Sequence, residues 1–442
     1  EPLRRVAPRV AHSRPGRGDP CGIVRPRCTR GDPAEHLAVE VVVLRRRVRA
    51  EAQLVRAHPR HRLERLAGSV HVGGRPAPER PARREILGLG AAALVGGTLA
   101  APAVVRADTK FSWKMATSWP KNTPGVGVNA QRLADSITAM SGGRLTVQLY
   151  AAGELVPAFE VFDAVSSGAA EMGHASPYFW QGKDKTFHFF TGVPFGLFAN
   201  EHMGWIWFGG GQALWEKAYA PFGVQPFFCG SSGPQAGGWF RKEIKTVDDF
   251  KGLKMRIAGL GGEVLRRLGV NVVLLPPGEI FQAMQSGTID AAEWVGPWND
   301  LAFGLFRVAK NYYMPSFFEF GPSLELMVNK KLFDALPDDL KEIVKRAAYA
   351  SAAESYADFS YHNVVSMKPL MEKEGVQARV LSDDIVKVLA KETKAVMAEI
   401  AGTSPLAKEV FDSFEAFRAQ ATSYAKVMDA AAYQMREVGR DA

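Results

Sequence analysis

Cysteine is scarce in this sequence, and the first 107 residues contain no aromatic side chain. The three cysteines are Cys21, Cys28 and Cys229, and only Cys229 lies beyond residue 107. The chain after residue 107 therefore cannot form an internal disulfide. Residues 1–107 also lack Met and Lys. A stretch of this composition buries too little apolar surface to fold alone, so we expect the folded part to begin near residue 108.

The positive charge of the chain is unevenly distributed. The whole sequence carries 55 Lys and Arg against 46 Asp and Glu, which gives a net charge of +9. Residues 1–107 hold 21 Arg and 9 acidic residues, and the rest holds 34 basic and 37 acidic residues. A basic face is the electrostatic footprint of a nucleic-acid-binding domain, and the part with aromatic residues has no basic excess. We therefore expect no nucleic-acid partner.

The N-terminal residues divide into two segments. Residues 1–82 are rich in Arg, Pro, Gly and Val and have poor periodicity, which predicts a disordered or spurious basic extension rather than a nucleic-acid tail. Residues 83–107 begin with paired arginines, continue with an uncharged stretch and end in Val-Arg-Ala. This order is typical of a twin-arginine signal peptide and predicts a periplasmic protein. A signal anchor is the alternative, which the glycines and Pro102 disfavour.

Strands and helices alternate after residue 108. Phe111–Thr117 and Leu145–Tyr150 have the composition of strands, and residues 124–140 between them are predicted to be helical. Repeated strand–helix units of this kind favour an α/β fold. Beyond a strand at 324–329 the chain is predicted to be nearly all helix, at 338–372, at 382–400 and from 406 to about 438.

Two segments of the chain align with each other without a gap. Residues 160–175 and 279–294 share Glu, Phe, Ala, Ser and Gly at five equivalent positions. Each segment predicts a short helix that ends at a glycine and is followed by a buried strand; coincidence between two ordinary turns is the alternative. Two related lobes would each present strand carboxyl ends, where open α/β sheets bind ligands, to a shared cleft.

These patterns predict a division into two lobes. We assign residues 108–230 together with about 321–365 to lobe I. Residues 231–320 together with about 366–442 form lobe II and the C-terminal helices.

No catalytic constellation is visible in the sequence. The four histidines after residue 107 have no metal-binding spacing, and neither a nucleophile elbow nor a Walker A loop occurs. The Gly-Ser-Ser-Gly run at 230–233 has the wrong spacing for an elbow. We therefore expect a binding protein rather than an enzyme.

Arg256 is the first candidate for a ligand contact. It lies late in a predicted strand, just before the Gly-Leu-Gly-Gly run at 259–262 that opens a helix. An arginine beside a helix N-terminus can hold a carboxylate through two parallel hydrogen bonds. A surface arginine on an edge strand is the alternative.

Glu293 is the second candidate. It lies at the end of an apolar strand at 290–295, where a buried carboxylate would need a cation or a donor. With the side-chain amide of Gln235 and a backbone carbonyl it would make an oxygen-only site, which suits Na⁺ or Ca²⁺. A partly solvated glutamate at a strand end is the alternative.

Four segments resemble the periplasmic substrate-binding receptors of TRAP transporters, the tripartite ion-driven uptake systems. These are residues 250–256, 280–290 with the Met-Gln-Ser-Gly run, 292–297 and 328–330. The Glu-Trp-Val-Gly-Pro string resembles the branch that binds 2-oxo acids such as pyruvate, or similar monocarboxylates, with a metal ion. The resemblance covers nearly the whole chain after residue 107. It implies a two-lobed α/β fold of the periplasmic-binding-protein type (type II-like) with long C-terminal helices.

The resemblance also implies roles for individual residues. Arg256 corresponds to the arginine that binds the substrate carboxylate. Gln235, Glu293 and the main chain of Trp294 correspond to the metal site, for Na⁺ or Ca²⁺. The expected substrate-binding residues are Arg256, Gln235, Tyr178, Trp294, Trp298 and Glu319, with the aromatic residues and Glu319 in the pocket wall.

This chain departs from the family pattern after the Gly-Pro pair. The branch has Tyr-Asp-Asp there, whereas this chain has Trp298-Asn299-Asp300. A larger indole at position 298 would favour an aromatic, hydroxy or branched acid.

The resemblance further implies partners and a binding mode. We expect integral membrane TRAP permease subunits and a homodimer through the C-terminal helix. A ligand of about six heavy atoms gains at most about 9 kcal/mol, and micromolar affinity already needs about 8 kcal/mol. Almost every ligand atom must therefore be contacted, which predicts hinge closure around the ligand. A metal-assisted periplasmic enzyme acting on a small organic acid and an ABC-type receptor are the alternatives.

Overall fold

The computed structural model describes residues 109–440 with the exception of residue 374. The predicted extension at 1–82 and the predicted signal peptide at 83–107 lie outside these residues. The described residues all fall within one compact unit, Ala101–Ala442. Among them, none of the helices combines the length and the apolar character needed to span a membrane.

The first sheet has five strands in the order β2-β1-β3-β10-β4. β1 pairs in parallel with β2 and β3, whereas β10 runs antiparallel to β3 and β4. The chain therefore returns to this sheet after it has built the second one. The strand predictions for β1 and β2 are confirmed at both ends. The bounds are β1 Phe111–Thr117, β2 Leu145–Tyr150, β3 Met172–Ala175, β4 Val224–Ser231 and β10 Ser323–Asn329.

The second sheet has six short strands in the order β11-β9-β5-β8-β6-β7. β6 pairs in parallel with β7 and β8, and β5 runs antiparallel to β8 and β9. The two sheets together confirm the predicted α/β class. The bounds are β5 Gly238–Phe240, β6 Lys254–Arg256, β7 Asn271–Val273, β8 Ala291–Ala292, β9 Asn311–Tyr313 and β11 Gln377–Arg379.

The two aligned segments of the sequence adopt the same local structure. Helix α3 (Val161–Ser167) and helix α8 (Ile280–Ser286) each have seven residues. They end at Gly168, with φ 83°, and at Gly287, with φ 77°, and this left-handed conformation favours glycine. β3 and β8 follow in the interiors of the two sheets. β8 is shorter than the predicted strand because the chain leaves the sheet at residue 293.

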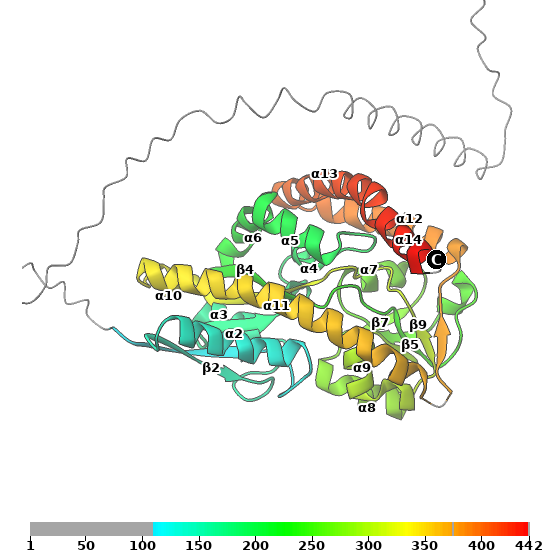
Figure 1. Cartoon of the computed structure of the whole chain (residues 1–442), viewed down its shortest axis with the longest axis horizontal. Coiled ribbons are helices and arrows are strands. Elements are labelled where there is room, and N and C mark those ends of the chain that lie inside the picture. Colours follow the sequence, from blue (N-terminus) through cyan, green and yellow to red (C-terminus); the bar gives the residue numbers. More distant parts are fainter. Residues whose placement is uncertain (1–108, 374, 441–442) are drawn as a thin grey trace, which may run out of the picture. The chain divides into compact units, whose positions relative to one another are not determined.

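A long helix connects the two sheets. Helix α11 (Asp338–Met371) packs against α2 and β4 at one end and against α9 farther along, as Figure 1 shows. Its first turn carries Asp338 and Asp339, which the positive end of the helix dipole stabilises. The other helices are α2 Val126–Met140, α4 His188–Thr191, α5 Ala199–Phe208, α6 Gly211–Tyr219, α7 Gly259–Arg267, α9 Pro297–Phe303, α10 Lys330–Asp334, α12 Asp383–Ala401, α13 Pro405–Val427 and α14 Asp429–Arg440.

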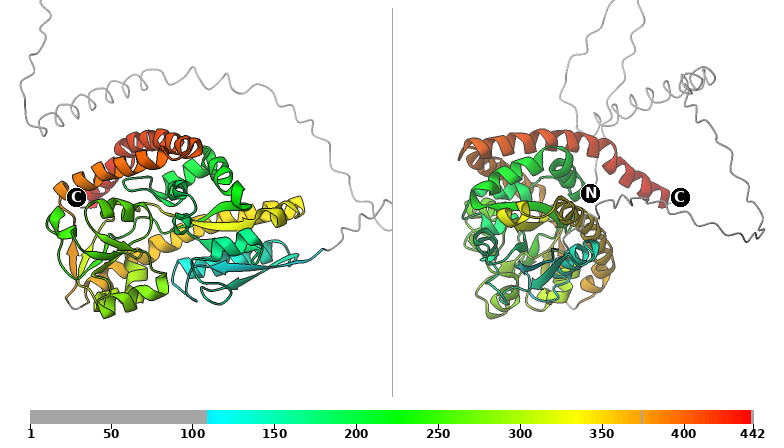
Figure 2. Two further views of the ribbon diagram at one scale, coloured as in Figure 1. Left: turned by 180° about the vertical axis from the view of Figure 1, so that it is seen from behind. Right: turned by 90° about the vertical axis from the view of Figure 1, so that its left-hand side faces the viewer.

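The last C-terminal helix differs from the sequence-based expectation. The helix predicted from 406 to about 438 is broken at Met428, between α13 and α14. Helix α12 packs against α7, and α13 packs against α4, α5 and α6, which precede residue 230. The assignment of residues 366–442 to lobe II and the C-terminal helices stays a prediction. Figure 2 shows α13 lying over the green α5 and α6.

A buried glutamate lies in the core of the first sheet. Glu325, on β10, is fully buried, and its carboxylate accepts hydrogen bonds from Trp180 Nε1 at 2.6 Å and from the Tyr219 hydroxyl at 2.8 Å. Both donors are neutral. Burial raises the pKa of Glu325 to about 8, although the two hydrogen bonds oppose this rise.

The raised pKa of Glu325 predicts a pH dependence of stability. A carboxyl that holds its proton in the native state but loses it near pH 4.5 in the unfolded state destabilises the native state as the pH rises. The Glu325 contribution should fall by roughly 1.4 kcal/mol per pH unit from about pH 4.5 to about pH 8. Urea denaturation of wild type and Glu325→Gln across this range isolates the contribution. Parallel pH profiles for the two proteins would contradict it.

Candidate functional site

An enclosed cavity of about 20 Å³ lies where strands of both sheets end. Trp119 follows β1, Tyr178 follows β3 and Trp294 follows β8. The carboxyl ends of strands are where open α/β sheets place ligands. The structure therefore brings strand ends of both sheets to one cavity. The lining residues are Trp119, Val126, Ser176, Tyr178, Ser232, Gln235, Trp294, Val295, Pro322 and Leu324.

Arg256 and Glu293 form a buried ion pair beside this cavity. Both side chains are 1% exposed. Nη1 of Arg256 donates to the backbone carbonyl of Glu293 at 2.7 Å and to its carboxylate Oε2 at 3.0 Å, and Nε donates to the carbonyl of Leu275 at 3.3 Å. Nη2 takes part in none of these bonds. The guanidinium also lies over the indole of Trp294, with Cζ 5.7 Å from the ring centroid.

The backbone positions this pair. Arg256 is the last residue of β6, and its carbonyl accepts a hydrogen bond from the amide of Glu293, just beyond β8, at 2.9 Å. The parallel pairing of β6 with β8 therefore places the two side chains next to each other. Helix α7 begins three residues after Arg256, at Gly259 with φ 70°. A Cβ at Gly259 would come within 3.1 Å of the Tyr178 ring, so this glycine lets the tyrosine pack against the helix N-terminus.

Gln235 and Glu319 are joined by a backbone hydrogen bond. The backbone amide of Gln235 donates to the backbone carbonyl of Glu319 at 3.0 Å. The backbone carbonyl of Gln235 accepts from the backbone amide of Ser316 at 2.9 Å. The side-chain nitrogen of Gln235 donates to Ser232 Oγ at 2.9 Å. These bonds fix the side-chain amide of Gln235 and leave its oxygen Oε1 without a hydrogen-bond partner.

The charges of the site act on one another. Burial raises the pKa of Glu319, the nearby charge of Glu293 raises it further, and Arg256 opposes both effects. Burial also raises the pKa of Glu293, against the attraction of Arg256. The pKa of the Tyr178 hydroxyl is raised by burial and by both carboxylates. One arginine thus faces two buried carboxyl groups.

Three buried oxygens of the site have no hydrogen-bond partner. They are Gln235 Oε1, Glu293 Oε1 and Glu319 Oε2. Buried polar atoms are normally paired, so unpaired oxygens in one place indicate a missing partner of positive charge. Oxygen donors are the ligands preferred by hard cations. In the described part of the chain no group of three or more His, Cys, Asp or Glu side chains gathers as for a metal ion.

Trp298 does not lie with the other predicted residues. It is in helix α9, where its ring stacks on His362 with centroids 4.2 Å apart and contacts Phe359 at 5.3 Å, both on α11. Like Arg256, Glu293 and Glu319, it is not among the residues that line the cavity. The assignment of Trp298 to the substrate-binding residues stays a prediction. Its side chain stabilises the packing of α9 on α11.

Sequence reasoning missed several cavity residues, Trp119, Ser176 and Ser232 among them. Trp119 lies two residues after β1 and Ser176 directly after β3, so the preference of ligands for strand ends applies to them. Ser232 belongs to the Gly-Ser-Ser-Gly run at 230–233, whose spacing does not fit a nucleophile elbow. Its hydroxyl instead accepts the hydrogen bond that fixes Gln235.

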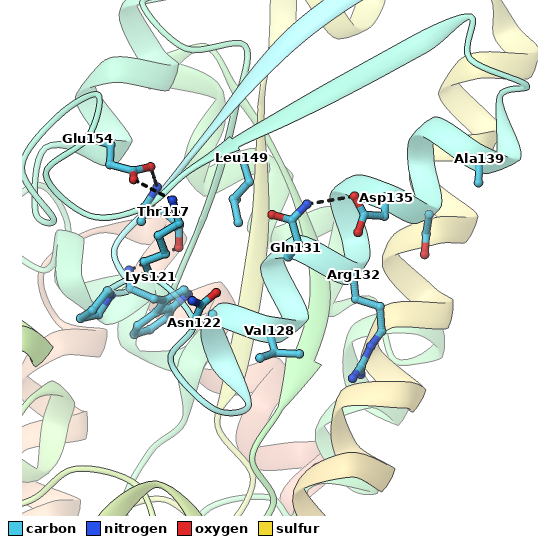
Figure 3. A pocket seen from close by; sticks show the side chains of 15 residues that line it. Thr117, Lys121, Asn122, Val128, Gln131, Arg132, Asp135, Ala139, Leu149 and Glu154 are labelled. Atoms are coloured by element: carbon cyan, nitrogen blue, oxygen red, sulfur yellow. Dashed lines mark hydrogen bonds and ion pairs between the residues drawn. The ribbon is translucent and has the colours of Figure 1, made fainter. Parts of the chain in front are cut away.

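A second, open pocket of about 600 Å³ lies over β1, α2 and β2. Figure 3 shows Lys121 and Glu154 on one side and Gln131 and Asp135 along α2 on the other. Lys121 pairs with Glu154 at 3.4 Å, and Gln131 donates to Asp135 at 2.9 Å. Trp119 lines both this pocket and the enclosed cavity.

Comparisons with known proteins agree with the two-sheet architecture. A monocarboxylate 2-oxoacid-binding periplasmic protein of Nostoc sp. (strain PCC 7120) is 41% identical over 351 residues, which cover 78% of this chain and 96% of that protein. A TRAP periplasmic solute-binding protein of Pseudoalteromonas atlantica T6c, solved with bound sodium and pyruvate, is 37% identical with a TM-score of 0.72. The match covers 74% of this chain and 99% of that one.

A TRAP transporter solute-binding protein of Bordetella bronchiseptica RB50 was solved as a mixed-occupancy dimer with copurified calcium and picolinate. It is 33% identical with a TM-score of 0.73, and the match covers 75% of this chain and 99% of that one. These similarities confirm the predicted fold, the receptor function and the periplasmic location. They favour a TRAP receptor over the ABC-type receptor and the metal-assisted enzyme.

The family model for bacterial extracellular solute-binding proteins, family 7, matches residues 115–403. This range contains the second sheet, the first sheet apart from the start of β1, and all the site residues described above. The chain therefore belongs to the DctP family of solute-binding receptors of TRAP transporters.

Proposed function

We propose that this receptor captures a small 2-oxo acid, or a related monocarboxylate, together with Na⁺ or Ca²⁺ in the enclosed cavity. The observation that carries the proposal is the buried Arg256–Glu293 pair beside three unpaired carboxylate and amide oxygens. An arginine can neutralise a ligand carboxylate, and unpaired oxygens can hold a cation. The relatives that bind pyruvate or picolinate with sodium or calcium support this combination.

Arg256 is assigned to the carboxylate of the ligand. Its Nη1 and Nε are held by Glu293 and Leu275, and this restraint fixes the plane of the guanidinium before a ligand arrives. Nη2 can then donate to an incoming carboxylate in a charge-assisted hydrogen bond. Because the guanidinium is already ordered, little side-chain entropy is lost on binding.

Gln235, Glu293 and the main chain of Trp294 are assigned to the cation. The unpaired Oε1 atoms of Gln235 and Glu293 are both buried, so a cation would satisfy two groups that otherwise destabilise the folded state. When bound, the ion would neutralise buried carboxylate charge and draw the ligand oxygens toward it. Tyr178 and Glu319 are assigned to the cavity wall, where Glu319 Oε2 is also unpaired.

Hinge closure is inferred because the residues that line the cavity come from both lobes. Trp119, Ser176 and Tyr178 come from residues 108–230, which we assign to lobe I, whereas Gln235 and Trp294 come from residues 231–320 of lobe II. A cavity of about 20 Å³ holds little more than one water molecule. The lobes must therefore separate to admit an acid of six heavy atoms and close again around it.

The remaining assignments concern export and partners. We propose export by the twin-arginine route, from the paired arginines at 83–84, and delivery of the ligand to integral membrane TRAP permease subunits. We also propose a homodimer through the C-terminal helices. Large apolar side chains along α13 and α14 support the dimer because they are more than half exposed: Tyr424, Val427, Met428, Tyr433, Met435 and Val438.

Replacing the arginine should abolish ligand binding. Arg256→Ala removes the positive charge that faces the two carboxyl groups, so pyruvate affinity should fall by at least about 100-fold in calorimetric titration. Arg266→Ala is the matched control, because Arg266 lies on nearby helix α7 with its side chain 45% exposed. Circular dichroism melting checks that both variants fold. Equal affinity of Arg256→Ala and wild type would rule out the assignment.

Replacing the glutamate should weaken cation and ligand binding together. Glu293→Gln removes the charge that attracts the ion, so calcium or sodium should no longer raise pyruvate affinity or the melting temperature. Glu263→Gln, a change of the same type on α7, should behave like wild type. If chelated, sodium-free wild type binds pyruvate as tightly as the ion-loaded protein, the cation has no part in binding.

A further inference from the structure

We propose that Trp119 is the wall that limits ligand size in this cavity, and that His174 is the residue that positions it. The inference rests on the proposed function, because it concerns selection among 2-oxo acids. Trp119 lines the enclosed cavity on one side and the open outer pocket on the other. Trp119 is thus a buried residue shared by the two pockets.

Three hydrogen bonds connect His174 to the turn that carries Trp119. The backbone carbonyl of His174 accepts from Thr117 Oγ1 at 2.9 Å and from the amide of Ser118 at 3.2 Å. The ring nitrogen Nδ1 accepts from Nε1 of Trp119 at 2.8 Å. His174 thus fixes three consecutive residues, and its side chain sets the rotation of the indole.

The imidazole of His174 is suited to this role because it stays neutral. His174 lies on β3, between β1 and β10, and its side chain is completely buried, which lowers its pKa to about 3. Nδ1 therefore remains an acceptor for the indole throughout the physiological range, and the ring proton lies on Nε2. The Asn129 atom 3.4 Å from Nε2 is the donor Nδ2, which does not accept this proton. A protonated ring would present a second donor to the indole and release it.

The indole is also held from the opposite side of the cavity. Trp119 is 2% exposed, and its ring lies 6.5 Å from that of Trp294 and 5.7 Å from that of Phe179, in tilted arrangements. Trp294 follows strand β8 of the second sheet, and its main chain is assigned to the cation. Contact between the two indoles thus sets the distance across the cavity, and a ligand with a branched or aromatic side chain would have to displace Trp119.

The test compares two ligands of different size, pyruvate and 4-methyl-2-oxopentanoate. Calorimetric titration gives the ratio of their dissociation constants for wild type, Trp119→Phe, His174→Leu and the double variant. Trp180→Phe is the matched control, because it also removes a buried indole hydrogen bond, to Glu325, but lies outside the cavity. His174→Gln, which keeps an acceptor in the side chain, tests for conservative rescue.

Wild type and Trp180→Phe should prefer pyruvate. Trp119→Phe should shift the ratio toward the larger acid by about tenfold or more, the effect of changing the volume of an apolar pocket. His174→Leu should shift it in the same direction and add nothing in the Trp119→Phe background, whereas His174→Gln should stay close to wild type. If the ratio of dissociation constants is unchanged in Trp119→Phe, Trp119 does not limit ligand size. If the shifts of this ratio in the two single variants add in the double variant, His174 does not act through Trp119.

Two further outcomes are decisive. If wild type binds neither acid in the presence of Na⁺ or Ca²⁺, the proposed function fails and this inference with it; binding of both acids with equal affinity overturns the inference alone. If His174→Leu does not fold, the indole N–H proton of Trp119, identified by its loss in Trp119→Phe, decides the positioning role. Slow exchange with solvent supports the bond to His174, and exchange at the rate of a free indole contradicts it.

Discussion

The site depends on one buried ion pair, the contact of Arg256 with Glu293. Burying either charge alone would be strongly unfavourable, and the pairing of β6 with β8 lets each side chain neutralise the other. The pair is nevertheless incomplete, because Glu319 adds a second carboxyl group and three oxygens stay unpaired. In the proposed function, these unpaired oxygens would hold the cation. The arginine would bind the carboxylate of the ligand.

The two sheets each place strand ends at the cavity beside this ion pair. Strands β1 and β3 end at one side of the cavity and β6 and β8 near the other, so ligand groups must meet side chains from both. Helix α11 packs against β4 of the first sheet and against α9, the helix that follows β8 of the second sheet. A ligand of few atoms needs contacts from both sides to bind tightly.

Much of this arrangement could be predicted from local sequence patterns. Strands β1 and β2, the glycine-ended helices α3 and α8, and the placement of Arg256 before a helix follow from residues close together in the chain. The packing of the Trp298 side chain on α11 could not be predicted, because its partner His362 lies far away in the sequence. His174 and Trp119 are 55 residues apart in the sequence, and no local sequence pattern indicates a hydrogen bond between residues so widely separated. The break at Met428 likewise interrupts a continuous apolar pattern.

The central claim is that one cavity holds an anionic ligand and a cation side by side. The most direct measurement is a crystal structure of the protein grown with pyruvate and calcium. The account predicts the pyruvate carboxylate on the guanidinium of Arg256 and the ion among the oxygens of Gln235, Glu293 and Trp294. Pyruvate bound in the open pocket over α2, with Arg256 still occupied only by Glu293, would contradict it.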